Sequence, residues 1–268
     1  AESRISMIDI HSHLLPGMDD GAQNADESIS IAQAAYNAGF QTIVATPHVA
    51  TSKEFESFGR ITARIHDLQL LLDANGLPIN ILPGAEVFPS DLLIPALSGG
   101  NPPSIAESSY ILIGLPLLST PINLGQVLFE AQSRGFRPVL AHPERVIDVQ
   151  QNPDSLLQYL ERGILLQLNA GSITGYYGKQ AMATAHVLLK HRWAHFLASD
   201  AHSRGAFPRF QAALLQITSR YGKEMADALA IHNPRLLLSN AKVPSDPLPY
   251  SMETNAVKRF WNLFMRKP

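Results

Sequence analysis

The chain has 268 residues, a formal net charge of −2 from 21 basic and 23 acidic side chains, and no cysteine. The nearly balanced charge gives no electrostatic footprint for nucleic acid, and the lack of cysteine excludes disulfides, iron–sulfur clusters and catalysis by a cysteine nucleophile. No apolar run reaches the roughly 18 residues of a membrane helix, and no basic segment followed by an apolar stretch opens the chain, so we expect a cytoplasmic protein.

Short apolar runs alternate with amphipathic stretches along the chain. The apolar runs predict seven buried strands: Ile5–Ile10, Gln41–Thr46, Ile79–Glu86, Tyr110–Leu115, Arg137–Ala141, Ile164–Asn169 and Ala194–Ser199. The amphipathic stretches predict helices: Asp26–Ala38, Phe55–Ala74, Leu124–Arg134, Ser155–Arg162, Lys179–His191 and Phe207–Tyr221. This alternation predicts a parallel α/β fold. No glycine-rich phosphate loop follows the first strand, so we favour a closed or nearly closed barrel over an open doubly wound sheet.

The end of the chain differs in composition from the rest. Residues 242–254 carry three prolines and predict a linker, which leaves residues 1–241 as the barrel domain. The tail, residues 255–268, contains four basic residues and no acidic one, with its apolar residues on one helical face. Such a tail is either a solvated end or a segment that contacts a membrane surface or a partner.

Polar side chains follow every predicted strand except the fourth, where Gly114 offers no ligand. They are Asp9, His11, His13, Asp19, Asp20, His48, Glu86, His142, Glu144, Arg145, Asn169, Asp200 and His202. The carboxyl ends of parallel barrel strands meet at one face, so we expect these side chains to lie together. His11-Ser12-His13 and Asp200-Ala201-His202 repeat one spacing that turns both side chains the same way on an extended chain. Imidazole with carboxylate predicts a divalent metal centre and suits Mn²⁺, Fe or Zn²⁺ alike.

A single histidine at a strand end is more often a hydrogen-bonded structural residue, and the shared position of several is what favours a metal site. The remaining histidines are expected to be structural or exposed: His66, His186, His191, His195 and His232. Arg145 follows His142 in Ala-His-Pro-Glu-Arg, which favours binding of a phosphate over an ion pair with Glu144.

Six motifs together resemble one family of proteins. They are Met-Ile-Asp-Ile-His-Ser-His (7–13), Asp-Asp-Gly (19–21), Ala-Thr-Pro-His (45–48), Pro-Gly-Ala-Glu (83–86), Ala-His-Pro-Glu-Arg (141–145) and Ala-Ser-Asp-Ala-His (198–202). The chain resembles the PHP superfamily (polymerase and histidinol phosphatase), and more closely its bacterial manganese-dependent protein-tyrosine phosphatases of the CpsB/YwqE type, which act in capsule and exopolysaccharide control. The likeness covers roughly residues 7–240 and implies a distorted seven-stranded (β/α) barrel.

The resemblance also implies two or three metal ions per chain, with manganese expected. By this likeness the first ion is held by His11, His13 and Asp200, with Glu86 bridging to a second held by His142, and a third is held by Asp20, His48 and His202. The sequence departs from the family twice. Gly114 stands where the family usually has Glu or His, and the second phosphate-binding arginine, expected after Asp-x-His, is offered only by Arg204 or Arg209, neither of which aligns cleanly.

The expected reaction is hydrolysis of phosphotyrosine by a metal-bound hydroxide. Arg145 and the ions would neutralise charge on the phosphoryl oxygens, and Asp200 would act through the metal. His48 or His202 could protonate the leaving phenolate if not held as ligands. The resemblance implies a membrane-associated bacterial tyrosine kinase as substrate, with residues 255–268 against the inner membrane face. Two alternatives stay open: a small-molecule phosphatase of the histidinol-phosphate type, and a catalytically weak regulatory binder.

Overall fold

The computed structural model describes residues 6–51, 59–90, 92–99 and 102–248. Nine strands were found among these residues: β1 (Met7–Ser12), β2 (Phe40–Ala45), β3 (His48–Val49), β4 (Asn80–Pro83), β5 (Glu86–Val87), β6 (Tyr110–Ile113), β7 (Arg137–Ala141), β8 (Leu165–Asn169) and β9 (Phe196–Ala198). All seven predicted strands are present. The second corresponds to β2, and the short strand β3 follows just past its predicted end. The third is interrupted and forms β4 and β5. Pro47 lies between β2 and β3 and Pro83 at the end of β4, and neither has the N–H that would continue the ladder.

The strands form two parallel sheets, ordered β1-β2-β4 and β3-β5-β6-β7-β8-β9. The free edges of β1 and β9 are joined by an isolated bridge between Ser12, the last residue of β1, and Ala201, just beyond β9. There the backbone N–H of Asp200 donates to His11 O at 2.9 Å, and that of His13 donates to Ala201 O at 3.0 Å. The parallel arrangement is therefore as predicted, but the ladder is split into two sheets rather than continuous around the barrel.

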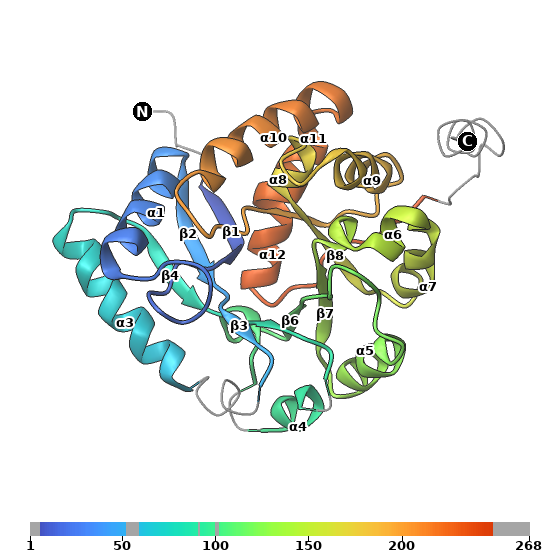
Figure 1. The fold of residues 1–268 in the computed structure, drawn as a ribbon, viewed down its shortest axis with the longest axis horizontal. Coiled ribbons are helices and arrows are strands. Elements are labelled where there is room, and N and C mark those ends of the chain that lie inside the picture. Colours follow the sequence, from blue (N-terminus) through green and yellow to red (C-terminus); the bar gives the residue numbers. More distant parts are fainter. Residues whose placement is uncertain (1–5, 52–58, 91, 100–101, 249–268) are drawn as a thin grey trace, which may run out of the picture.

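Helices lie around the strands, as Figure 1 shows for α1, α3, α5, α9 and α10. The α-helices are α1 (Ala25–Asn37), α3 (Gly59–Ala74), α4 (Leu93–Leu97), α5 (Leu124–Ser133), α6 (Ile147–Gln151), α7 (Leu157–Leu160), α8 (Ala170–Ile173), α9 (Lys179–Lys190), α10 (Ala206–Tyr221), α11 (Lys223–Asp227) and α12 (Asn233–Leu238), with a π-helical turn at Ala228–His232. The predicted helix at 155–162 is shorter, and the start of the one predicted at 55–74 lies outside the described residues. No helix in the described part of the chain is long and apolar enough to cross a membrane.

The buried apolar side chains form two clusters. The larger lies between the strands and the surrounding helices. The smaller fills the inside of the strand ring and is formed by Ile8, Ile10, Val44, Ile105, Tyr110, Leu112, Val139, Ala141, Leu165, Phe196, Ala198, Leu237 and Val243. Alternate residues of one strand belong to different clusters, as expected when both faces of a parallel strand are covered. The interior is thus packed toward the amino ends of the strands, and polar side chains are left at the carboxyl ends.

The chain that follows α12 closes the amino end of the barrel. The Tyr110 hydroxyl donates to Ala241 O at 2.6 Å and accepts from the Val243 N–H at 3.0 Å. The Trp193 indole N–H donates to Leu248 O at 2.9 Å. Residues 242–248, the first part of the predicted linker, therefore pack against the barrel. Residues 249–254 and the predicted tail, 255–268, lie outside the described residues, so the domain division stays a prediction.

Candidate metal centre

The structure brings all eight predicted metal ligands together at the carboxyl ends of the strands. They fall into three groups, in each of which the candidate ligand atoms lie within 4.8 Å of one another: His11, His13 and Asp200; His11, Glu86 and His142; and His13, Asp20, His48 and His202. His11 and His13 each belong to two groups, so the three candidate positions are adjacent. The resemblance implied nearly the same division. The structure adds His11 to the group of Glu86 and His142, and His13 to the group of Asp20, His48 and His202.

Hydrogen bonds fix how His11 and His13 present their rings. The His11 Nδ1 lies 2.9 Å from Gln167 Oε1, and the Gln167 amide nitrogen donates elsewhere, so His11 Nδ1 carries the proton. His13 Nδ1 donates to Asp19 Oδ2 at 2.7 Å. When a ring is neutral, its Nε2 atom then carries a lone pair. The Nε2 atoms of His11 and His13 face each other at 3.0 Å. Two lone pairs at that distance repel unless a proton or a metal ion lies between them.

Carboxylates surround this pair of nitrogens. Asp200 Oδ1 lies 3.3 Å from His13 Nε2 and 3.5 Å from His11 Nε2. The second oxygen, Oδ2, accepts from Arg145 at 2.9 Å and from the Asn169 amide at 2.7 Å, so Oδ1 is the oxygen turned to the imidazoles. Asp200 has a positive φ of 50°, an uncommon backbone conformation for a residue other than glycine. That turn at the end of β9 aims the carboxylate at the centre.

Glu86, at the start of β5, lies between the groups. Its Oε1 is 3.1 Å from His142 Nε2, and its Oε2 is 3.4 Å from His11 Nε2 and 2.9 Å from His48 Nδ1. Burial alone would raise the pKa of Glu86, but these imidazoles hold it well below its ordinary value, so the side chain stays ionised. Neither carboxylate oxygen has a hydrogen-bond partner of good geometry among the described residues.

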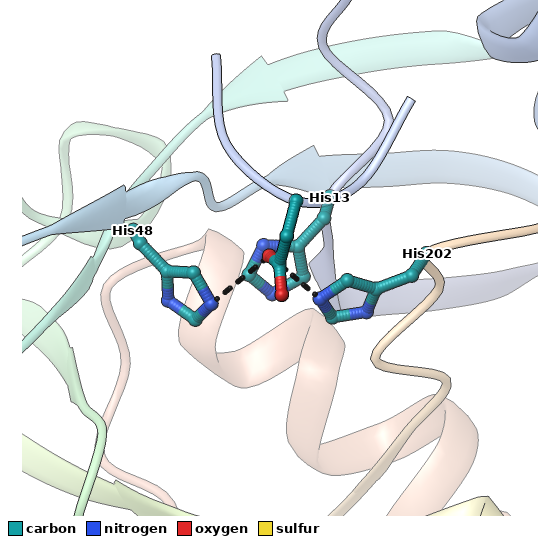
Figure 2. A group of neighbouring side chains, drawn as sticks. His13, His48 and His202 are labelled. Atoms are coloured by element: carbon teal, nitrogen blue, oxygen red, sulfur yellow. Dashed lines mark hydrogen bonds and ion pairs between the residues drawn. The ribbon is translucent and has the colours of Figure 1, made fainter. Parts of the chain in front are cut away.

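The third group is the most open. Figure 2 shows the rings of His13, His48 and His202 turned toward one another. The side chains of His48 and His202 are 32% and 33% exposed, and that of Asp20 is 71% exposed. His202 Nδ1 donates to the Asp200 backbone oxygen, so its Nε2 is the atom that faces Asp20 Oδ1 at 3.2 Å. This is the side from which solvent reaches the centre.

Asp19 supports the centre from behind. Besides His13, its carboxylate accepts from the backbone N–H groups of Gly21 and His48. Burial would raise the pKa of Asp19, but the hydrogen bond and charge of His13 outweigh it and lower the pKa to about 2. The sequence placed Asp19 at this end of the barrel without a role, and the structure shows it orienting a ligand ring, as carboxylates beside metal-binding histidines commonly do.

The donor set fits divalent cations. The paired Nε2 atoms, the Glu86 oxygens without hydrogen bonds and the ionised Asp200 carboxylate all present lone pairs to shared positions. Neighbouring carboxylates outweigh burial and raise the pKa of His13 to about 10, so a proton occupies this position when no metal does. A metal bound here would displace that proton, which is the usual linkage between metal affinity and pH.

Gly114 explains one departure from the family pattern. A Cβ at this position would lie 2.5 Å from Glu86 Oε1. Any side chain at the end of β6 would therefore displace Glu86 from its place beside His142. The lack of a side chain here makes room for the Glu86 carboxylate, which the imidazoles of His11, His48 and His142 approach.

The three candidate phosphate-binding arginines lie in different surroundings. The guanidinium of Arg145 stacks on the Tyr177 ring with its central carbon 3.9 Å from the ring centroid, and that of Arg209 stacks on Tyr176 at 4.0 Å. Arg204 is exposed on the loop before α10. Arg145 Nη1 lies 2.9 Å from Asp200 Oδ2, and among the described residues Arg145 has no ion pair with Glu144.

Two acidic residues of the same barrel end have other partners. Asp9 accepts from the Ser199 N–H at 3.0 Å and from its hydroxyl, which ties β1 to β9. Glu144 is buried and accepts from the Asn169 N–H at 2.9 Å and the Ser172 hydroxyl at 2.7 Å. Neither belongs to a candidate metal group among the described residues.

Sequence reasoning missed Gln167, Tyr176 and Tyr177. Gln167 lies two residues before Asn169 on β8, so strand alternation could have placed it on the same face. The tyrosines lie in the loop after α8, where no periodic pattern predicts orientation. Of the histidines expected to be structural, His195 is buried and hydrogen-bonded at the amino end of the barrel, and His186 bonds the Tyr221 hydroxyl at 2.9 Å.

A parallel α/β barrel with imidazoles and carboxylates gathered at its strand ends defines the chain as a (β/α)-barrel protein with a candidate metal centre. Residues 7–239 match the family described as capsular polysaccharide synthesis, CpsB/CapC, and the chain belongs to this family.

The curated relatives include the tyrosine-protein phosphatase YwqE of Bacillus subtilis, 34% identical over 242 residues that cover 90% of this chain and 95% of YwqE. A putative tyrosine-protein phosphatase, CapC of Staphylococcus aureus, is 30% identical, covering 88% of this chain and 93% of CapC. The tyrosine-protein phosphatase CpsB of Streptococcus agalactiae is 27% identical, covering 87% and 99%. The predicted family is confirmed.

Solved structures give the same result. A chain from the crystal structures of YwqE from Bacillus subtilis and CpsB from Streptococcus pneumoniae, metal-dependent tyrosine phosphatases, matches with a TM-score of 0.86 at 34% identity, covering 91% of this chain and all of that chain. The lactonase Lmo2620 from Listeria monocytogenes matches at 11% identity with a TM-score of 0.58, which shows a shared fold alone. The predicted fold class is confirmed.

Proposed function

We propose that this chain is a metal-dependent protein-tyrosine phosphatase that acts in capsule or exopolysaccharide synthesis. One observation carries the proposal: three adjacent groups of imidazoles and carboxylates meet at the carboxyl ends of the strands. Membership of a family whose relatives are tyrosine-protein phosphatases supports the substrate class.

We assign the eight side chains as ligands of two or three divalent ions, with Mn²⁺ as the first candidate. The groups are those of His11, His13 and Asp200, of His11, Glu86 and His142, and of His13, Asp20, His48 and His202. Bound divalent ions supply Lewis-acid polarisation of the phosphoryl group and lower the pKa of water. Imidazole with carboxylate does not choose among Mn²⁺, Fe and Zn²⁺, so metal analysis must decide.

The chain's own residues would position the ester. Arg145 lies beside Asp200 and has further N–H donors for a phosphoryl oxygen, whose charge it would neutralise. Arg209 is favoured over Arg204 as the second arginine because it is held against Tyr176. His48 and His202 are partly exposed at the open side, where the leaving phenolate would depart. A phenolate of pKa near 10 needs only modest help from an acid.

The test combines metal analysis with turnover. We expect purified protein to contain Mn²⁺ or a related ion and to hydrolyse a phosphotyrosine peptide faster than histidinol phosphate. His11→Ala should lose both metal and turnover, whereas His66→Ala, on the exposed side of α3, should keep both. Wild-type rates in His11→Ala would contradict the site, and a preference for histidinol phosphate would favour a small-molecule phosphatase.

We further propose a membrane-associated bacterial tyrosine kinase as the substrate, met in the cytoplasm at the inner membrane face. The support is compositional: residues 255–268 contain Lys258, Arg259, Arg266 and Lys267 and no acidic residue. Each basic residue near an anionic surface adds about 1 kcal/mol to binding. Co-sedimentation with anionic vesicles should fall when residues 255–268 are removed, and equal partitioning of both forms would contradict the proposal.

A further inference from the structure

The rings of two adjacent tyrosines stack on the two arginines that the proposed function places at the phosphate. Tyr176 and Tyr177 lie in the loop between α8 and α9, with ring centroids 5.0 Å apart and planes at 79°. Arg145 reaches Tyr177 from the 3-10 turn that follows β7, and Arg209 reaches Tyr176 from the first turn of α10. Side chains from three distant segments thus form one assembly at the metal-bearing end of the barrel.

The Tyr177 ring is fixed by its surroundings. A Cβ at Gly171 would lie 2.6 Å from the ring, so only glycine permits this close approach. The Asn169 amide, which donates to Asp200, also lies 3.4 Å from the Tyr177 hydroxyl. The backbone N–H of Tyr176 donates to Gly171 O at 2.9 Å and anchors the loop. The Tyr177 ring is therefore held in a fixed position relative to the Asp200 carboxylate, which Arg145 contacts.

Stacking suits an arginine that must bind an anion. A carboxylate bound through both edges of the guanidinium would leave few in-plane N–H donors for an anion. A ring face instead holds the guanidinium through its π surface and leaves the donors at the edge of the plane available. Arg145 donates to Asp200 through Nη1, and the guanidinium has further N–H donors for an anion. For Arg209, Tyr176 is the partner that limits its motion, because the side chain is otherwise only half-buried.

We propose that Tyr177 and Tyr176 are positioning residues, which hold the guanidinium groups of Arg145 and Arg209 on adjacent rings as a preorganised clamp for a phosphate dianion. This rests on the proposed function, because it assumes that the ligand is a phosphate ester. Tyr177 positions Arg145, which also contacts Asp200, and Tyr176 positions Arg209.

The test measures phosphate affinity apart from turnover. Manganese-loaded Tyr177→Leu should bind inorganic phosphate about tenfold more weakly by calorimetry, the scale of a partly desolvated cation–π contact. Tyr176→Ala should lose about two- to fivefold, since its ring is 61% exposed. Tyr177→Phe keeps the ring and should stay within about twofold of wild type. Metal content should not change in any of the three.

A matched control is Phe129→Ala on α5. Phe129 is 63% exposed, and no cation in the described part of the chain stacks on its ring. This variant should leave phosphate affinity unchanged. Tyr177→Leu and Tyr176→Ala should also raise KM for a phosphotyrosine peptide more than they lower kcat. If Tyr177→Leu fails to fold, Tyr176→Ala and the double variants below still decide.

Double variants separate positioning from direct contact with the ligand. If Tyr176 acts through Arg209, Tyr176→Ala should have no further effect in an Arg209→Ala background. A full additional loss there, or wild-type phosphate affinity in both Tyr177→Leu and Tyr176→Ala, would overturn the inference while leaving the phosphatase proposal standing. Phosphate binding without turnover of any phosphotyrosine peptide would instead overturn the proposed function alone.

Discussion

His195, at the amino ends of the strands, is nearly as buried as His11 at the carboxyl ends, but the partners of the two imidazoles differ. His195 Nδ1 accepts from the Leu166 N–H at 3.1 Å, and its Nε2 bonds the Ser245 hydroxyl at 2.9 Å. His11 has one ordinary partner, Gln167, and its other nitrogen faces His13 Nε2 at 3.0 Å. Both nitrogens of His195 have partners within the protein, whereas the Nε2 of His11 needs a shared proton or a metal ion.

The same contrast holds for the two ends as a whole. At the amino end, hydroxyl, indole and imidazole groups bond to the closing segment, and the contacts are those of a stable core. At the carboxyl end, the buried atoms of Glu86 and the Nδ1 of His142 have no hydrogen-bond partner among the described residues. Burial alone therefore does not separate structural from functional histidines in this chain, whereas the chemistry of their partners does.

The largest expected effect at the carboxyl end comes from Asp200→Asn, which keeps the shape of the side chain and removes its charge. Turnover should fall by about 10³-fold, because Lewis-acid stabilisation is worth several kcal/mol and each 1.36 kcal/mol is tenfold in rate. Steady-state kinetics on a phosphotyrosine peptide, with bound metal measured in parallel, checks this. Asp227→Asn on α11 is the matched control, and turnover within tenfold of wild type in Asp200→Asn would argue against the metal role.

At the amino end, His195 should affect how the free energy of unfolding depends on pH. Burial lowers the pKa of His195 to about 4 from an ordinary 6.5. The unfolded chain therefore takes up a proton first as pH falls, and this site loses about 3 kcal/mol of stability between pH 6.5 and pH 4. His195→Asn lacks that proton uptake, so the difference in stability between wild type and variant should shift by this amount across the window. Urea unfolding from pH 7 to pH 4 measures it, and a constant difference would show that His195 is not held neutral by the fold.

The smallest of the three effects concerns Gln167, which sets the ring orientation of His11. Gln167→Leu should weaken metal binding about 10- to 100-fold, the usual cost of losing the partner of a metal-binding histidine. Competition with a chelator measures the affinity, and Gln158→Leu on the surface of α7 is the control. Unchanged affinity would mean that packing alone orients the imidazole.

Strand alternation and the rule that parallel strands share a functional end were enough to predict most of this centre. They placed His11, Glu86 and Asp200 together because each follows an apolar run. They could not predict that the strands break at Pro47 and Pro83, since the effect depends on which ladder bonds are lost. They also could not place Tyr177, because a loop side chain takes its direction from tertiary contacts, here the space beside Gly171.

The contacts of Leu248 place the last described residue at the amino end of the barrel. Its N–H donates to His191 O at 2.9 Å just past α9, which runs back to the amino ends of the strands. A protein tethered to a surface through the residues after Leu248 would present its metal centre to the opposite side. Tyrosines on long extensions that reach around a docked enzyme would then be dephosphorylated more readily than tyrosines lying close to the bilayer.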